Sequence, residues 1–174
     1  EHYRSGRFNN ALKSVMDHYD EIREIFVATI AEEKRAAWSP FFPVCQSCGR
    51  IYSTRVTAVD RPGLAVSYTC DTPLAGKYEC CGHAGTASIL DGGCKVGWKV
   101  DWALRWYVFG IHYEMYGKDL IPSAELSGKI VKVLGGRPIA FRSSDVRLAA
   151  EDGRLTVEGE LSMAGRTLPL SARL

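Results

Sequence analysis

Several features that would assign the protein to a particular class are missing from its sequence. No apolar run approaches the roughly 20 residues that a membrane-spanning helix needs, and the first residues, EHYRSGRFNN, lack the apolar core of a secretory signal peptide. The formal net charge is only +2, which is too small to indicate nucleic-acid binding by itself. We therefore expect a cytoplasmic protein with no membrane segment.

Common catalytic motifs are missing as well. The sequence has no nucleophile elbow, no phosphate-binding glycine loop and no Walker motif. His2, His18 and His112 stand alone, which favours surface or packing roles over general-base catalysis. Chemistry therefore has to be sought among the cysteines and the aromatic residues.

The hydrophobic pattern predicts an α+β fold. Apolar residues recur at helical spacing over residues 9–34, where we expect one amphipathic helix. Residues 50–60 and 64–70 are rich in Val, Tyr and Thr and are separated by DRPG, so they predict a β-hairpin.

The pattern changes after Gly97. Three tryptophans recur every fourth residue from Trp98, a spacing that predicts one aromatic stripe on a helix. IHYEMYG, at residues 111–117, suits a short strand, and a helix capped by Ser123 is expected to end at Gly135. The order of strand, loop and helix is typical of α/β folds, so we predict a partial Rossmann-type segment over residues 96–137.

Beyond Arg137 the residues alternate between apolar and polar in three stretches, which predicts three antiparallel strands. We place a boundary near residues 136–140. The expected parts are an N-terminal helix (9–34), a zinc-knuckle β-hairpin module (41–95), a partial Rossmann-type segment (96–137) and a C-terminal antiparallel β-meander (138–174).

Cys45 and Cys48 are two of six cysteines and are followed at once by Gly49. Without a secretory signal, closely spaced cysteines on turns favour metal over disulfides. Two thiolates on a tight turn with a glycine behind them resemble half of a zinc knuckle.

A tetrahedral zinc site needs two further ligands. Cys70 and Cys81 are the first choice, because a strand that ends at Cys70 and a turn at CCGH could bring both to one end of the hairpin. Cys80 or His83 could replace either of them. Free thiols and a redox pair are the alternatives to zinc, although the residues after Cys48 have a strand pattern where a redox pair would begin a helix. No carboxylate or histidine pair supports a catalytic metal, so the expected zinc is structural.

Three stretches carry a resemblance to a known family: SPFFPVCQSCGRI, CGHAG, and the long segment from WKVDW through GKDL to GGRP. Over residues 1–137 the sequence resembles the class I lysyl-tRNA synthetases. This resemblance implies a Rossmann-type enzyme that joins lysine to tRNA(Lys) with ATP and carries a zinc-bearing insertion. It implies that Cys45, Cys48, Cys70 and Cys81 bind the zinc. It also implies a lysine pocket and its mouth, made by Trp98, Asp101, Gly117, Lys118 and Asp119.

Two departures from that family limit the expected activity. Leu120 stands where many members have histidine, and neither the His-rich signature nor the KMSKS-like loop that binds ATP is present. ATP is therefore expected only in the full-length family, and aminoacylation by this chain alone is not expected.

Residues 138–174 resemble strands of the YceI-like lipocalin-type barrels, which hold isoprenoid-like lipids. The two resemblances together suggest a synthetase fragment or chimera that retains tRNA or lysine binding at most. The alternatives are an artificial or rearranged protein with a purely structural role and a small-lipid-binding β-module.

Overall fold

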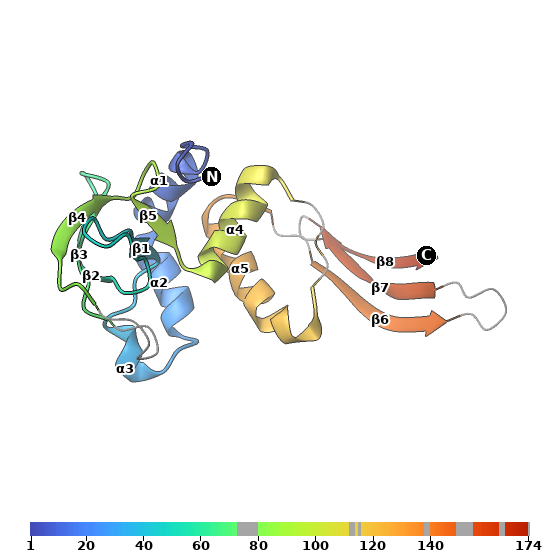
Figure 1. Ribbon diagram of the computed structural model, residues 1–174. Coiled ribbons are helices and arrows are strands. Elements are labelled where there is room, and N and C mark those ends of the chain that lie inside the picture. The colour runs from blue at the N-terminus through green and yellow to red at the C-terminus, as the bar shows by residue number, and fades with distance from the viewer. Residues whose placement is uncertain are drawn as a thin grey trace.

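The N-terminal part of the protein forms short helices that pack against small antiparallel sheets (Figure 1). The computed structural model describes residues 1–72, 80–111, 114, 116–137, 140–148, 155–163 and 166–173. The side chains of the last three ranges, apart from that of Pro169, lie outside this description.

The prediction of one unbroken helix over residues 9–34 is wrong. The chain forms α1 (Asn9–Asp17), α2 (Tyr19–Val27) and α3 (Glu32–Arg35). His18 leaves helical geometry with φ −99° and ψ 26°, and the next residue, Tyr19, stacks on Phe41 with ring centroids 6.3 Å apart. Asp, His and Tyr have modest helix propensity, so tertiary packing decides where this helix breaks.

The predicted hairpin is confirmed. β2 (Arg55–Asp60) pairs antiparallel with β3 (Ala65–Thr69), and β4 (Ala84–Ser88) adds to the other edge of β3. A second, two-stranded sheet joins β1 (Phe41–Pro43) to β5 (Cys94–Val96). This pairing brings the segment before the first cysteine pair back to the segment before Trp98.

The described residues from 97 to 137 contain helices and no Rossmann sheet. They form α4 (Trp98–Phe109), the 3₁₀ helix η1 (Lys118–Leu120) and α5 (Ile121–Val133), and every sheet described in the chain is antiparallel. His112, Tyr113 and Met115 lie outside the described residues, so the short strand expected at 111–117 is not tested. The expected partial Rossmann-type segment is therefore not seen.

Helix α5 ends as predicted but begins differently. Gly135 follows its last turn with φ +82°, a left-handed conformation that glycine adopts easily. Ser123 is not the cap, because the helix already begins at Ile121, with Pro122 in its first turn.

β6 (Ala140–Leu148), β7 (Leu155–Met163) and β8 (Arg166–Arg173) pair antiparallel in that order, and Figure 1 shows this sheet at the far end of the molecule from β2–β4. Its connecting turns lie outside the described residues, so a complete meander is not seen.

One continuous hydrophobic core connects the helices to the cysteine-bearing sheet. Leu12 from α1, Val66 from β3, Leu104 from α4 and Ile130 from α5 all have 0% exposure within it, and Cys70 belongs to the same cluster. In the part of the chain that the structure describes, no helix is both long enough and apolar enough to cross a membrane. The cysteine cluster is thus anchored to the main body of the protein.

Candidate metal centre

The structure brings four cysteine sulfurs together at one end of the β2–β4 sheet. Their Sγ atoms all lie within 4.8 Å of one another. Cys45 Sγ is 3.5 Å from Cys81 Sγ, and Cys48 Sγ is 3.8 Å from Cys70 Sγ. All four cysteines are free thiols.

A local turn positions the sulfur atoms in each half of the site. After β1, the N–H of Gly49 donates to the Cys45 carbonyl at 2.8 Å and the N–H of Cys45 donates to the Arg50 carbonyl at 2.9 Å. Gly49 has φ +71°, which explains the need for glycine behind the cysteine pair.

The second half joins the end of β3 to the start of β4. The N–H of Cys70 donates to the His83 carbonyl at 2.8 Å, and the N–H of Gly82 donates to the Cys70 carbonyl at 3.1 Å. Gly82 has φ +70°. The antiparallel register of these strands therefore sets Cys81 beside Cys70.

The environment of the cluster shifts the pKa values of its thiols in opposite directions. Burial by itself would raise the pKa of Cys45, but hydrogen bonds from the backbone N–H groups of Cys48 and Ser47 and from neighbouring thiols lower it to about 6. Burial, reinforced by the neighbouring thiols, raises the pKa of Cys70 to about 12. Without a cation the cluster gives up one proton easily and holds others, as expected for crowded thiols whose thiolates would repel one another.

The two alternative ligands named from the sequence do not belong to this cluster. Among the described residues it comprises Cys45, Cys48, Cys70 and Cys81, without Cys80 or His83. His83 lies beside the ring of Tyr68 instead, and its Nε2 is buried with no hydrogen-bond partner among the described residues. Cys94 is fully buried elsewhere in the core, and burial raises its pKa to about 12.

Tyr68 is the residue near the cluster that the sequence did not single out. It lies on β3 with 1% exposure. Its hydroxyl accepts the N–H of Gln46, the residue after Cys45, at 2.8 Å. Only its position two residues before Cys70 could have pointed to it.

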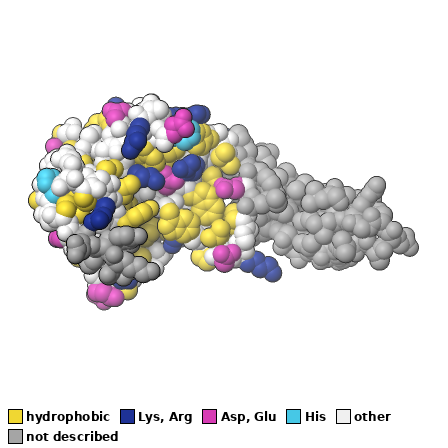
Figure 2. Space-filling model, in the orientation of Figure 1, with side chains coloured by type: hydrophobic (Ala, Val, Ile, Leu, Met, Phe, Trp, Pro, Cys, Tyr) yellow, Lys and Arg dark blue, Asp and Glu magenta, His cyan; other side chains and the backbone are white. Residues whose placement is uncertain are grey.

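The predicted tryptophan stripe is confirmed on α4. Trp98 stacks on Trp102 with ring centroids 5.9 Å apart, and Trp102 contacts Trp106 at 4.9 Å. The indole N–H groups of Trp102 and Trp106 both donate to Glu114 Oε2. Trp98 remains 56% exposed, and hydrophobic side chains gather on the face of the molecule near α4 (Figure 2). An aromatic face therefore stays open to solvent at the start of this helix.

The other residues named from the resemblance lie on α4 and at the start of η1. Asp101 accepts the Tyr3 hydroxyl at Oδ1, 2.5 Å away, and Arg105 Nε at Oδ2, 2.7 Å away. Gly117 precedes η1, and a Cβ at that position would lie only 2.5 Å from Asp119 Oδ1. Glycine therefore permits a close approach in this loop, where the residues at 117–119 are exposed.

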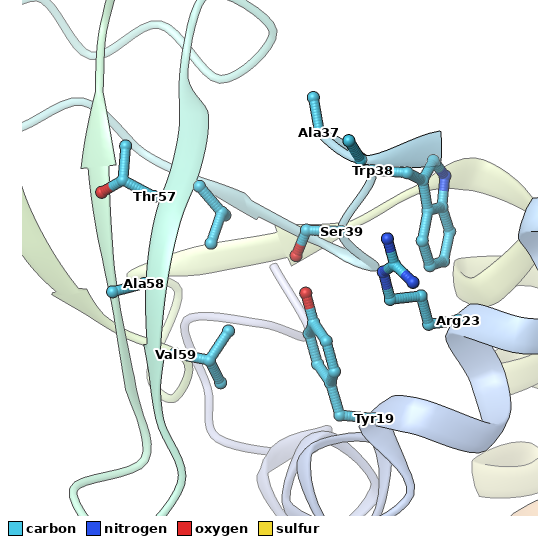
Figure 3. A pocket seen from close by; sticks show the side chains of 10 residues that line it. Tyr19, Arg23, Ala37, Trp38, Ser39, Thr57, Ala58 and Val59 are labelled. Atoms are coloured by element: carbon cyan, nitrogen blue, oxygen red, sulfur yellow. The ribbon is translucent and has the colours of Figure 1, made fainter. Parts of the chain in front are cut away.

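A separate pocket of about 140 Å³ lies between α2 and the edge strand β2 (Figure 3). Tyr19 and Arg23 face it from α2, opposite Thr57 and Val59. Arg23 donates a hydrogen bond to the Arg35 carbonyl, which ties α2 to α3. None of the residues named from the sequence as site residues lines this pocket.

Comparisons with known proteins agree with the family resemblance seen over residues 1–137. The family described as "tRNA synthetases class I (K)" matches residues 1–148, past the boundary expected near Arg137. Nothing in these comparisons supports a YceI-like C-terminal part.

Proteins named lysine–tRNA ligase from Rickettsia africae, Rickettsia rickettsii and Rickettsia felis are each 35% identical to the chain over 136 residues. The match covers 78% of this chain and 24% of each relative, so the chain spans about a quarter of their length. Since the family match covers most of its residues, the chain belongs to the class I lysyl-tRNA synthetase family.

Proposed function

We propose that Cys45, Cys48, Cys70 and Cys81 hold one structural zinc ion. Four thiolates at the usual Zn–S distance of about 2.3 Å in a tetrahedron would have sulfurs about 3.8 Å apart. The observed separations of 3.5 Å and 3.8 Å are close to that value. This convergence of four sulfurs is the observation that carries the proposal.

The proposed zinc is structural because its donor set is complete. Four protein thiolates fill a tetrahedral ion and leave no position for water or substrate, whereas a catalytic zinc keeps one position open. Cys45 lies just after β1, Cys70 just after β3 and Cys81 just before β4. One ion would therefore join two separate sheets, so its binding free energy would add to folding stability.

We further propose that the chain supplies the zinc-bearing part of a lysine–tRNA ligase and part of its lysine site. The names and identity of the relatives support this assignment. The exposed face of Trp98 could attract the lysine ammonium group. Asp101 is already oriented by Tyr3 and Arg105, and its oxygens keep lone pairs for a further donor.

Gly117, Lys118 and Asp119 remain the proposed mouth of that lysine site. Their support is the GKD sequence, the tight approach at Gly117 and their exposure to solvent. The division at residues 1–137 and 138–174 remains a proposal too.

Metal content and stability test the zinc proposal. Elemental analysis should find one zinc per chain, and a chelator should lower the thermal unfolding temperature of the wild type. Cys81→Ser should lose the metal and the response to chelator. Cys80→Ser is the matched control, since the neighbouring Cys80 is outside the cluster, and it should keep both. A wild-type chain without zinc would remove the proposal.

Lysine titration followed by tryptophan fluorescence tests the second part. Lysine should change the tryptophan fluorescence. Norleucine should not change it, because norleucine lacks the side-chain ammonium group of lysine. Trp98→Ala should abolish the response. An equal response to both amino acids would contradict the proposed pocket.

A further inference from the structure

Two sulfur contacts in the cysteine cluster cross between its two halves. Cys45 and Cys48 come from the turn after β1, whereas Cys70 lies just after β3 and Cys81 just before β4. Each half gives one sulfur to each contact: Cys45 Sγ is 3.5 Å from Cys81 Sγ, and Cys48 Sγ is 3.8 Å from Cys70 Sγ. A disulfide at either contact would therefore join the same two halves that the proposed zinc joins.

Access to solvent differs between these sulfurs. Cys45 and Cys70 are 1% and 0% exposed, and Cys48 is half-buried, whereas Cys81 is exposed. Cysteines that peroxides oxidise reversibly are accessible thiolates with a second cysteine close enough to form a disulfide. Because cysteines bind zinc as thiolates, Cys81 would meet these conditions in the metal-bound chain, with Cys45 as the second cysteine.

We propose that Cys81 is a site of reversible oxidation by peroxides, which forms a Cys45–Cys81 disulfide and releases the zinc. This inference rests on the proposed zinc function. The Cys81 thiolate attacks one oxygen of hydrogen peroxide, so that an S–O bond forms, the O–O bond breaks and hydroxide leaves. The Cys45 thiolate then attacks Cys81 Sγ, so that an S–S bond forms, the S–O bond breaks and a second hydroxide leaves. Two protons from solvent turn both hydroxides into water, and the peroxide has gained the two electrons that the thiolates lost.

Zinc release follows from the loss of ligands. A disulfide removes two of the four thiolates, and Cys48 and Cys70 alone cannot fill a tetrahedral site. Their sulfurs, 3.8 Å apart, can form a second disulfide with a second peroxide molecule. The oxidised chain then keeps its two halves joined by covalent bonds, which disfavour the unfolded state. A dithiol such as dithiothreitol reverses the reaction, because it returns two electrons to each disulfide and is itself oxidised.

Two other disulfides are close in the sequence. A Cys80–Cys81 disulfide is disfavoured, because neighbouring Cα atoms are about 3.8 Å apart and disulfides usually join Cα atoms about 4.4–6.8 Å apart. A Cys45–Cys48 disulfide would leave out Cys81, the exposed sulfur of the cluster. The identity of the first disulfide therefore tests the proposed route.

The experiment treats the zinc-loaded wild-type chain with a small excess of hydrogen peroxide. A chromophoric chelator measures free zinc before and after the treatment, and mass spectrometry of unreduced peptides identifies the disulfides over time. Most of the zinc should be released, Cys45–Cys81 should be the first disulfide, and dithiothreitol with added zinc should restore the bound metal. Cys80→Ser is the matched control, since Cys80 lies beside Cys81 but outside the cluster, and it should behave as the wild type does.

Three results would overturn the inference and leave the zinc proposal standing. They are zinc that stays bound in the presence of peroxide, a first disulfide other than Cys45–Cys81, and a Cys80→Ser chain that no longer releases its zinc. A wild-type chain that contains no zinc before the treatment would overturn both proposals. The metal content measured before peroxide is added separates these two kinds of failure.

Discussion

Phenylalanine in place of Tyr3 would keep the aromatic ring and remove one hydroxyl group. Tyr3 is 7% exposed, and its ring contacts Phe8 edge-on with centroids 5.0 Å apart. The hydroxyl donates to Asp101 Oδ1 at 2.5 Å and accepts the Val96 N–H at 3.4 Å. It therefore joins the N-terminal residues to β5 and to the first turn of α4.

The expected cost follows from these contacts. A hydrogen bond to a charged group contributes about 1.5–3 kcal/mol, and the Asp101 side chain is only 18% exposed, so water compensates poorly for the loss. Tyr3→Phe should lower the free energy of unfolding by about 1.5–3 kcal/mol. For a chain of this size each kcal/mol shifts the unfolding temperature by about 2–4 °C, so Tm should fall by roughly 3–12 °C.

Urea denaturation at neutral pH measures this loss. Tyr52→Phe, at an exposed position, should change the free energy of unfolding by no more than about 0.5 kcal/mol. A double-mutant cycle with Asp101→Asn should give a coupling free energy of about 0.5–3 kcal/mol, as found for residues in contact. A Tyr3→Phe chain as stable as the Tyr52→Phe control, or a cycle without coupling, would refute this role for the hydroxyl group.

Two further predictions concern the core. Ile130→Ala should lower the free energy of unfolding, measured by urea denaturation, by about 2–5 kcal/mol because Ile130 is fully buried. Ile121→Ala on the same helix, at 41% exposure, should lower it far less. Equal losses of stability in the two variants would contradict the assigned burial. The pKa of Cys94 is raised from 9.0 to about 12, so the stability that its protonated thiol contributes is complete below pH 9 and declines as the pH rises toward 12, by up to about 1.4 kcal/mol per pH unit. Cys94→Ala should therefore lose stability less steeply than the wild type between those pH values, and parallel curves in pH-dependent urea denaturation would count against the raised pKa.

Local sequence signals were sufficient where one segment forms its structure largely alone. The hairpin of β2 and β3 follows from β-branched residues on either side of DRPG. The end of α5 follows from Gly135, whose left-handed backbone suits glycine. The fourfold spacing of the tryptophans predicted their stripe, because residues four apart share one face of a helix.

Predictions failed where long-range packing competes with a local pattern. The break at His18 lies within a continuous amphipathic pattern, and the contact between Tyr19 and Phe41 has no signal in that pattern. The partial Rossmann-type segment was inferred from an order of elements, yet a parallel sheet depends on which strands meet. In the part of the chain that the structure describes, strands meet only in antiparallel pairs.

The cysteine cluster shows both contributions. Residue spacing is sufficient to place Cys45 and Cys48 on one turn, because only two residues separate them and Gly49 follows at once. Long-range packing brings Cys70 and Cys81 to them, leaves Cys80 and His83 outside the cluster, and sets the Tyr68 hydroxyl against the N–H of Gln46. The cause is the pairing of β3 with β4, which continues past both strands in the hydrogen bonds that join Cys70 to His83 and Gly82 and so sets Cys81 beside Cys70.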